Sequence, residues 1–310
     1  MSDFLDKYRR LNTSFESRLI FHVGVNAGFF SEFNNMVLAI LYCLDNKIQF
    51  CLYSADANFS YEEGWNDYFL PFCPESKDPF HSRYNKRFHH HTLIRKLNPA
   101  YYLSKKKEKY DYLTFELWYK FRDRENENKH YDIPELGISG NLRTACRQII
   151  DKIWKYNEQT ETEINQQKAP LLLPKKYIGM HIRSGDKFVE SNLLNIDVYF
   201  RKLKEISPIK DVFVLTDNYE IIHDINTHYP DYTVYTLCGE EERGYFHKEF
   251  HKRDKTQVKN AHLKLFASVD LLSNADYFIG TLSSNPGMYL GMRMPEENVF
   301  SVDLAEWQIW

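Results

Sequence analysis

The sequence lacks several features that would assign a protein to a functional class at first sight. No run of 18 apolar residues occurs in its 310 residues, so no membrane span is expected. The N-terminal stretch MSDFLDKYRRLNTSFESR is charged throughout and has no apolar core, so no signal peptide is predicted. The net charge is −3 with both signs well represented, which gives no electrostatic basis for a nucleic-acid partner. We therefore expect a cytoplasmic protein.

Two common nucleotide-binding signatures are also missing. The sequence contains neither the G-x-G-x-x-G pattern of NAD sites nor the G-x-x-x-x-G-K-[ST] loop of many ATPases. The five cysteines show no paired spacing, which indicates reduced thiols and not a disulfide framework. His89, His90 and His91 are consecutive and cannot all face one site, so we expect no metal and no other cofactor.

The first part of the chain follows a strand–helix–strand pattern. RLIFHVGV (18–25) is predicted to be a buried strand, and a turn containing Gly28 leads into a helix over 32–46 with apolar residues at helical spacing. QFCLY (49–53) is predicted to be a second strand. This order is that of a βαβ unit with two parallel strands.

The pattern is interrupted between 54 and 135, where aromatic, proline and charged residues predict helices and long loops. One long helix followed by a polar stretch is predicted over 138–167, and this polar stretch, which ends in Lys168-Ala169-Pro170, is the predicted linker. Beyond the linker, strands again alternate with helices, which predicts an α/β fold with a second parallel sheet. We therefore expect two Rossmann-like domains, over 1–167 and 168–310.

Ligands of open parallel sheets bind beyond the carboxyl ends of the strands, and two of these loops contain groups that suit a phosphate. In IGMHIRSGDKFVE (178–190), Arg183 can grip a diphosphate with two parallel hydrogen bonds and Lys187 adds a second positive charge. Ser283 and Ser284 stand where a helix is predicted to begin, so hydroxyls and backbone N–H groups would face an anion there. Asp217 and His181 are suited to bond a ribose or a base.

Each of these residues also has a structural interpretation. Arg183 and Asp186 are close enough in sequence to form a salt bridge at the end of the strand. Ser284 can serve as the N-cap of the following helix, which has Pro286 in its first turn. Asp217 stands in a Thr-Asp-Asn sequence that is common in turns.

Three stretches, taken together, resemble the fucosyltransferases that make α1,2, α1,6 and protein O-linked fucose. HIRSGDK (181–187) is similar to their first motif, and VFVLTDN (212–218) is similar to the second. LLSNADYFIGTLSSNPGMYLG (271–291) resembles the third motif, especially that of the α1,6 branch. NAGFFSEFNNMVLAILYCL (26–44), which contains Gly28, resembles the glycine-containing first turn and helix of that branch.

The resemblance implies a GT-B fold of two facing Rossmann-like domains, with GDP-fucose held mostly by the C-terminal domain and a saccharide acceptor on the N-terminal side. It also implies inversion at the anomeric carbon without a metal ion. Arg183 would bind the β-phosphate, His181 would lie near the nucleoside, Ser284 and Ser283 would lie at the diphosphate, and Asp217 would lie near the donor or orient Arg183.

The sequence departs from the family pattern at two positions. The α1,6 group has a carboxylate four residues after the motif lysine, but this chain has Ser191 there, so Glu190 and Asp186 are the candidates for the general base. The aspartate that contacts the base in relatives is replaced by Ser268, and Asp270 follows two residues later.

The sequence as a whole predicts a bacterial fucosyltransferase that builds a surface polysaccharide or a similar glycan. Its partners would be a nucleotide-sugar donor and a saccharide acceptor. Two alternatives stay open from the sequence: a transferase that uses another nucleotide sugar, and a non-catalytic module that binds a sugar nucleotide or a glycan.

Overall fold

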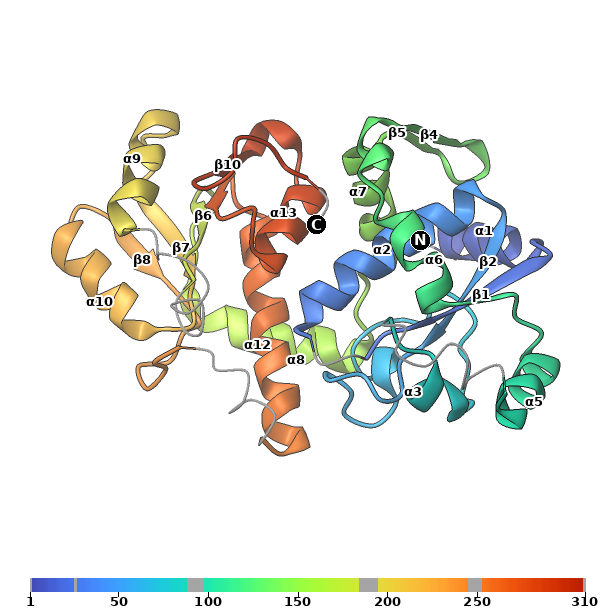
Figure 1. Cartoon of the computed structure of the whole chain (residues 1–310). Coiled ribbons are helices and arrows are strands. Elements are labelled where there is room, and N and C mark those ends of the chain that lie inside the picture. Colours follow the sequence, from blue (N-terminus) through green and yellow to red (C-terminus); the bar gives the residue numbers. More distant parts are fainter. Residues whose placement is uncertain (1, 25–26, 88–96, 184–194, 245–252, 309–310) are drawn as a thin grey trace. The chain divides into compact units, whose positions relative to one another are not determined.

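The computed structural model describes residues 2–24, 27–87, 97–183, 195–244 and 253–308 (Figure 1). The chain divides into two compact units: unit 1 runs to Asn157, and unit 2 runs from Glu158 to Trp307. Each unit contains a sheet of parallel strands flanked by helices, so the predicted α/β class is confirmed. In the described part of the chain, no helix combines the length and apolar character that a bilayer span requires.

Unit 1 is built on a parallel sheet in the order β2-β1-β3. Its strands are β1 (Ser17–His22), β2 (Ile48–Tyr53) and β3 (Tyr112–Leu113), and a separate antiparallel pair is formed by β4 (His130–Ile133) and β5 (Ile138–Asn141). Its helices are α1 (Ser2–Thr13), α2 (Phe29–Asp45), α3 (Phe80–Tyr84), α5 (Pro99–Glu108), α6 (Thr114–Phe121) and α7 (Leu142–Ile153), with 3₁₀ turns at Gly64–Asp67, Arg124–Asn128 and Pro134–Leu136. The predicted βαβ unit at the start of the chain is thus present.

The helix α2 is the central element of unit 1. It is apolar around most of its circumference, as expected for a helix that other elements cover on several sides. Its first turn joins an aromatic cluster in which the rings of Phe29 and Phe33 stack, and both rings meet the ring of Trp154. Trp65 and Phe69 stack on each other in the same cluster, with ring centroids 4.2 Å apart. This cluster lies at the end of α2 that follows β1.

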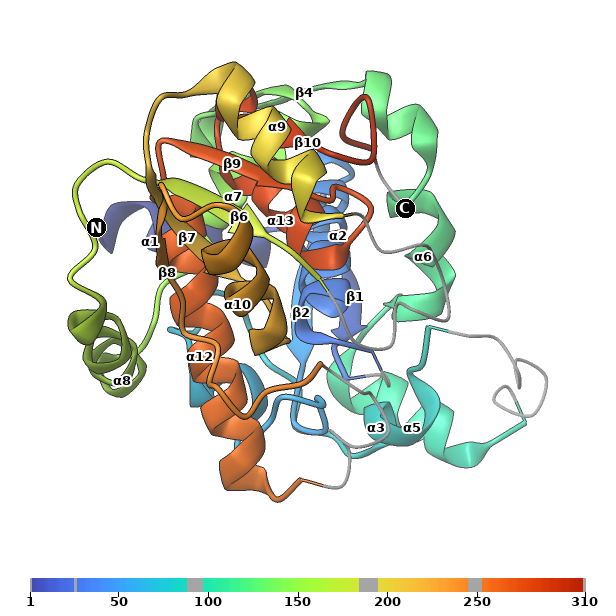
Figure 2. The ribbon, with the colours of Figure 1, turned by 90° about the vertical axis from the view of Figure 1, so that its left-hand side faces the viewer.

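Unit 2 contains a five-stranded parallel sheet in the order β10-β9-β6-β7-β8, which can be followed across the sheet in Figure 2. Its strands are β6 (Ile178–His181), β7 (Asp211–Leu215), β8 (Thr233–Tyr235), β9 (Tyr277–Gly280) and β10 (Val299–Ser301). Its helices are α8 (Glu158–Lys168), α9 (Ile196–Ile206), α10 (Tyr219–His228), α12 (Lys255–Ser273) and α13 (Asn285–Arg293), with 3₁₀ turns at Ala169–Leu171 and Glu296–Asn298. Figure 1 shows α9 and α10 on one face of this sheet and α12 and α13 on the other.

The structure differs from the sequence prediction over 138–167. Residues 138–141 are extended because they pair with β4, and Asn141 then starts α7 by accepting a hydrogen bond from the backbone of Thr144 at 2.9 Å. A second helix, α8, begins only at Glu158. Its Ile164 is buried, and its Glu163 forms an ion pair of 3.2 Å with Lys259 on α12. The boundary between the two units therefore lies before α8, whereas the sequence placed it after residue 167. The donor role of unit 2 and the acceptor role of unit 1 stay predictions.

Candidate active site

The order of the strands in unit 2 defines where a ligand is expected to bind. β6 comes first in the chain and lies in the middle of the sheet, with β7 and β8 on one side and β9 and β10 on the other. The direction of winding therefore reverses between β6 and β9. In open α/β sheets, ligands bind outside the carboxyl ends of the strands at such a switch point. The sheet register places His181, the last residue of β6, opposite Gly280, the last residue of β9.

His181 and Ser284 meet at this switch point, although 103 residues separate them in sequence. Their side chains are 3.4 Å apart, from Oγ to Nδ1, and the two residues are only 5% and 2% exposed. The Ser284 hydroxyl donates to the carbonyl of Thr281 at 2.8 Å and accepts from the backbone N–H of Gly287 at 3.1 Å. Because the hydroxyl proton is used on Thr281, the bond to His181 requires a proton on Nδ1 of the ring. Ser284 is thus both the N-cap of α13 and a partner of His181.

The loop after β9 is held by a carboxylate that the sequence analysis did not select. Asp303 follows β10 and accepts hydrogen bonds from the backbone N–H groups of Leu282, at 2.8 Å, and Ser283, at 3.2 Å. Both N–H groups are therefore already engaged within the protein, and a diphosphate here would rely on other groups of the loop. The position of Asp303, directly after a strand of the same sheet, is the signal that could have identified it. Burial and the charge of Asp303 also raise the pKa of Tyr199 on α9.

Gly287 makes the tight geometry of this loop possible. A Cβ atom at position 287 would lie 1.8 Å from the carbonyl oxygen of Thr281, so any side chain would force the first turn of α13 away from the loop. The same turn carries Ser284, and its displacement would separate the hydroxyl from His181. The sequence SSNPG therefore encodes a helix start pressed against the end of β9.

Arg183 and Asp217 lie at the same edge of the sheet. Arg183 follows the end of β6 by two residues and is partly buried. Asp217 follows β7, the strand next to β6, and its backbone carbonyl accepts a 2.7 Å hydrogen bond from Gly244. Asn218 caps α10 by accepting from the backbone of Glu220, so Asp217 stands in the turn that starts that helix. The structure thus brings one positive and one negative side chain to the edge where His181 and Ser284 meet.

Asp270 lies elsewhere. It is in the last turn of α12 and forms a 3.6 Å ion pair with Lys168 at the end of α8. The neighbouring carbonyl of Leu271 accepts a hydrogen bond from the hydroxyl of Tyr177, which immediately precedes β6. Asp270 is therefore near the amino ends of the strands, whereas His181 is at the carboxyl end. This placement argues against Asp270 as a residue that binds the donor.

The remaining predicted residues cannot be joined to this arrangement. Asp186, Lys187 and Glu190 lie outside the described residues. Gly28 belongs to unit 1, where it is the N-cap of α2 with ordinary extended backbone, and a Cβ atom there would meet no atom within 4 Å. Among the residues that the structure describes, no three His, Cys, Asp or Glu side chains lie close enough together to hold a metal ion.

Part of the chain is similar to a known protein family. Residues 139–286 match the sequence model of the α-(1,6)-fucosyltransferase N- and catalytic domains. No curated protein sequence matches the chain significantly.

Several solved structures share the fold. The chain is similar to the α-1,6-fucosyltransferase NodZ in a crystal soaked with GDP-fucose, at 16% identity and a TM-score of 0.56 over 90% of this chain and 93% of that one. Fucosyltransferase NodZ from Bradyrhizobium is 15% identical to this chain, with a TM-score of 0.55 over 90% of this chain and 94% of that one. A variant of Arabidopsis thaliana FUT1 in complex with GDP is 12% identical to this chain, with a TM-score of 0.50 over 95% of this chain and 76% of that one. The fold is therefore GT-B, and the match over residues 139–286 shows that this part of the chain is similar to the α-(1,6)-fucosyltransferases.

Proposed function

We propose that the chain transfers L-fucose from GDP-fucose to a hydroxyl group of a saccharide, with inversion at the anomeric carbon and without a metal ion. The observation that carries this proposal is the meeting of His181 and Ser284 at the switch point of the unit 2 sheet, next to Arg183. The family match and the GDP and GDP-fucose named for the similar structures support the choice of donor.

The proposed chemistry is a single displacement. The acceptor oxygen forms a bond to the anomeric carbon of fucose from the face opposite the diphosphate, and the bond from that carbon to the phosphate oxygen breaks. The leaving GDP gains negative charge in the transition state, so a fixed positive group beside it accelerates the reaction. Arg183 is the group that we assign to the β-phosphate, because a guanidinium can form two parallel hydrogen bonds with it.

We assign the other residues of this edge to binding. Ser283 is assigned to donate its hydroxyl group to the diphosphate, because Asp303 already engages two backbone N–H groups of the loop. The buried Ser284 hydroxyl already donates to Thr281, so Ser284 is assigned to hold the start of α13 beside the diphosphate. His181 is assigned to the nucleoside part and Asp217 to the donor or to the orientation of Arg183. Lys187 is assigned to the diphosphate. The proton of the acceptor hydroxyl is assigned to Glu190 or Asp186, and a role in a bacterial surface polysaccharide and a cytoplasmic location stay predictions.

The first experiment measures thermal stability with GDP, GDP-fucose, GDP-mannose, UDP-sugars and NAD, and follows the release of free sugar in the same samples. A ligand that binds only the native state stabilises it by about 2.7 kcal/mol at a hundredfold excess over its dissociation constant. The proposal predicts stabilisation by GDP and GDP-fucose with slow release of fucose. Stabilisation by a different nucleotide sugar alone would transfer the proposal to that donor, and no response to any guanine nucleotide would refute it.

A further inference from the structure

Unit 1 carries a buried histidine–aspartate pair at the carboxyl end of its own sheet. His22 is the last residue of β1 and pairs in register with Tyr53, the last residue of β2. Asp56 follows β2 by three residues, and its Oδ1 atom lies 2.6 Å from Nε2 of His22. The His22 side chain is completely buried, whereas that of Asp56 is 28% exposed. The pair thus lies at the edge where α/β sheets bind ligands, with its carboxylate reaching the surface.

Hydrogen bonds at both ring nitrogens fix the orientation of His22. Nδ1 lies 2.6 Å from the backbone carbonyl oxygen of Asn85, and a carbonyl oxygen only accepts, so Nδ1 carries a proton. Burial acts to raise the pKa of Asp56, but hydrogen bonds from His22 and Ser82 and the charges of His22 and Lys86 outweigh burial and lower it. Asp56 is therefore ionised at neutral pH and acts as a hydrogen-bond acceptor. The structure holds the buried His22 ring at hydrogen-bond distance from this carboxylate.

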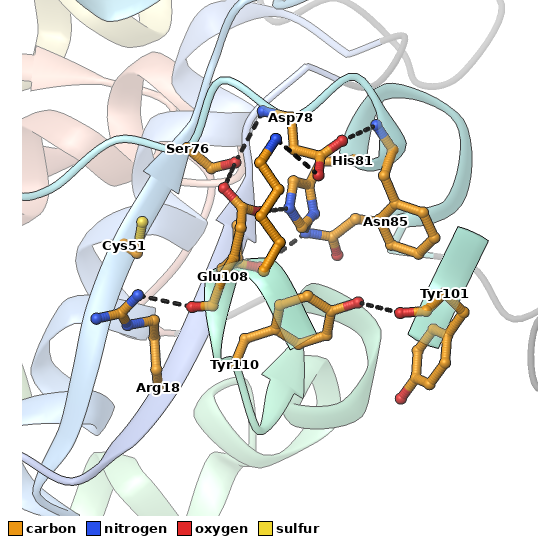
Figure 3. A network of polar contacts seen from close by, with 12 residues as sticks. Arg18, Cys51, Ser76, Asp78, His81, Asn85, Tyr101, Glu108 and Tyr110 are labelled. Carbon is orange, nitrogen blue, oxygen red and sulfur yellow. Dashed lines mark hydrogen bonds and ion pairs between the residues drawn. The ribbon is translucent and has the colours of Figure 1, made fainter. Parts of the chain in front are cut away.

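A second pair in the same unit shows what a purely structural arrangement looks like (Figure 3). His81 contacts Oε2 of Glu108 at 2.6 Å, and the hydroxyl of Ser76 donates to Oε1 at 2.7 Å. Both carboxylate oxygens of Glu108 thus have a partner within the protein at hydrogen-bond distance, and the Glu108 side chain is only 16% exposed. Arg18, near the start of β1, donates to the backbone carbonyl of Glu108 at 2.7 Å, while the His81 ring lies beside the ring of Tyr53, with 5.4 Å between the ring centres.

The His22–Asp56 pair differs from it on the side that faces the surface. Oδ2 of Asp56 has the Lys86 ammonium at 3.8 Å, which is beyond hydrogen-bond length, and the Lys86 side chain is 40% exposed. On the other side, the backbone of Gly24 lies so close that a Cβ atom would be 2.9 Å from both Oδ1 of Asp56 and Nε2 of His22. The backbone therefore packs tightly against Nε2 of His22 and Oδ1 of Asp56. On the side of Oδ2, the Asp56 carboxylate is accompanied by the Lys86 ammonium and the Ser82 hydroxyl.

We propose that Asp56, Ser82 and Lys86 bind hydroxyl groups of the acceptor saccharide, and that His22 is a positioning residue that holds the Asp56 carboxylate. This assignment rests on the proposed function. A sugar hydroxyl donates one hydrogen bond and accepts others, so a carboxylate beside an ammonium and a hydroxyl matches neighbouring hydroxyl groups of one ring. Because its carboxylate is held ionised, Asp56 serves to orient the acceptor, and the proton of the reacting hydroxyl goes to another base.

The test measures transfer from GDP-fucose to glucose, galactose, mannose, N-acetylglucosamine and their β1,4-linked disaccharides, with GDP-fucose hydrolysis followed separately. For the acceptor that the wild type uses best, Asp56→Asn and Lys86→Met are each expected to raise the acceptor KM roughly 10- to 100-fold, the range for a hydrogen bond with a charged group. Hydrolysis of GDP-fucose and stabilisation by GDP are expected to be unchanged. Lys86→Met disturbs no buried group, so it decides the question if Asp56→Asn does not fold.

Glu108→Gln is the matched control, because it removes the carboxylate of the other buried histidine pair. It is expected to lower the melting temperature as Asp56→Asn does, with the acceptor KM unchanged. An unchanged acceptor KM in Lys86→Met and Asp56→Asn, or an equal loss of hydrolysis in both, would overturn the assignment. So would a wild-type protein that hydrolyses GDP-fucose and glycosylates none of these sugars. A wild-type protein that does not bind GDP-fucose would instead refute the proposed function itself.

Discussion

Glu32 offers a prediction whose size follows from the structure. It lies in the first turn of α2 and is only 1% exposed, and its Oε1 atom is 3.4 Å from the guanidinium of Arg87. Burial raises the pKa of Glu32 from 4.5 to about 7, and the charge of Arg87 offsets part of this effect. Arg87 itself lies over the ring of Trp118, with 5.4 Å between the guanidinium carbon and the ring centre. The ionised form of Glu32 is therefore less favourable in the folded protein than in the unfolded chain.

The sign of the pH dependence follows directly. The folded-state pKa is above the unfolded value, so the folded protein binds more protons between pH 4.5 and about pH 7, and the free energy of unfolding falls as the pH rises through this window. The full difference corresponds to roughly 3 kcal/mol. Glu32→Gln cannot ionise. Its free energy of unfolding, relative to the wild type, should therefore rise by roughly 2 to 3 kcal/mol between pH 5 and pH 8.

The assay is urea unfolding followed by tryptophan fluorescence at several pH values, for the wild type, Glu32→Gln and Glu125→Gln. Glu125 is exposed on a 3₁₀ turn, so its variant should track the wild type at every pH. The comparison with the wild type cancels all other titrating groups. If the difference between Glu32→Gln and the wild type is the same at pH 5 and pH 8, the ion pair with Arg87 fully compensates for burial, and the reasoning fails.

Three further predictions concern unit 2. Arg183→Ala should keep the circular dichroism spectrum and melting temperature of the wild type but lose transfer activity by roughly 10² to 10³, the loss seen when a group that stabilises transition-state charge is removed; near-normal activity would refute the phosphate assignment. Gly287→Ala should destabilise the protein by about 1–3 kcal/mol and reduce its stabilisation by GDP, because its Cβ would meet Thr281. Gly28→Ala is the control: it should change the stability by no more than about 1 kcal/mol, because its Cβ position is open and alanine can adopt its backbone conformation. EDTA should leave transfer activity unchanged, and a strong loss would contradict the metal-free mechanism.

Several parts of the fold could be predicted because they depend on local pattern. The strands at 178–181, 211–215 and 277–280 follow apolar segments that alternate with helical ones, and Ser284 caps α13 as its place before Pro286 predicted. The strand β5 was missed because it pairs with β4, which lies in a segment without a strand pattern. The break between α7 and α8 was missed because nothing in the local pattern shows that Trp154 turns into the aromatic cluster.

The sequence alone determined the chemistry that is present at each strand end: an arginine and a histidine after or at the end of β6, two serines before α13, and a family resemblance in three motifs. Tertiary structure decided which of these groups meet. Ser284 reaches His181 only because β6 and β9 are neighbours, Asp303 enters the loop only because β10 lies beside β9, and Asp270 falls at the opposite edge because α12 runs antiparallel to the strands. The buried pair of His22 and Asp56 likewise exists only through the pairing of β1 with β2. Hydrogen bonds act over about 3 Å, so contacts between distant residues are set by strand order and register, and local sequence patterns do not specify either.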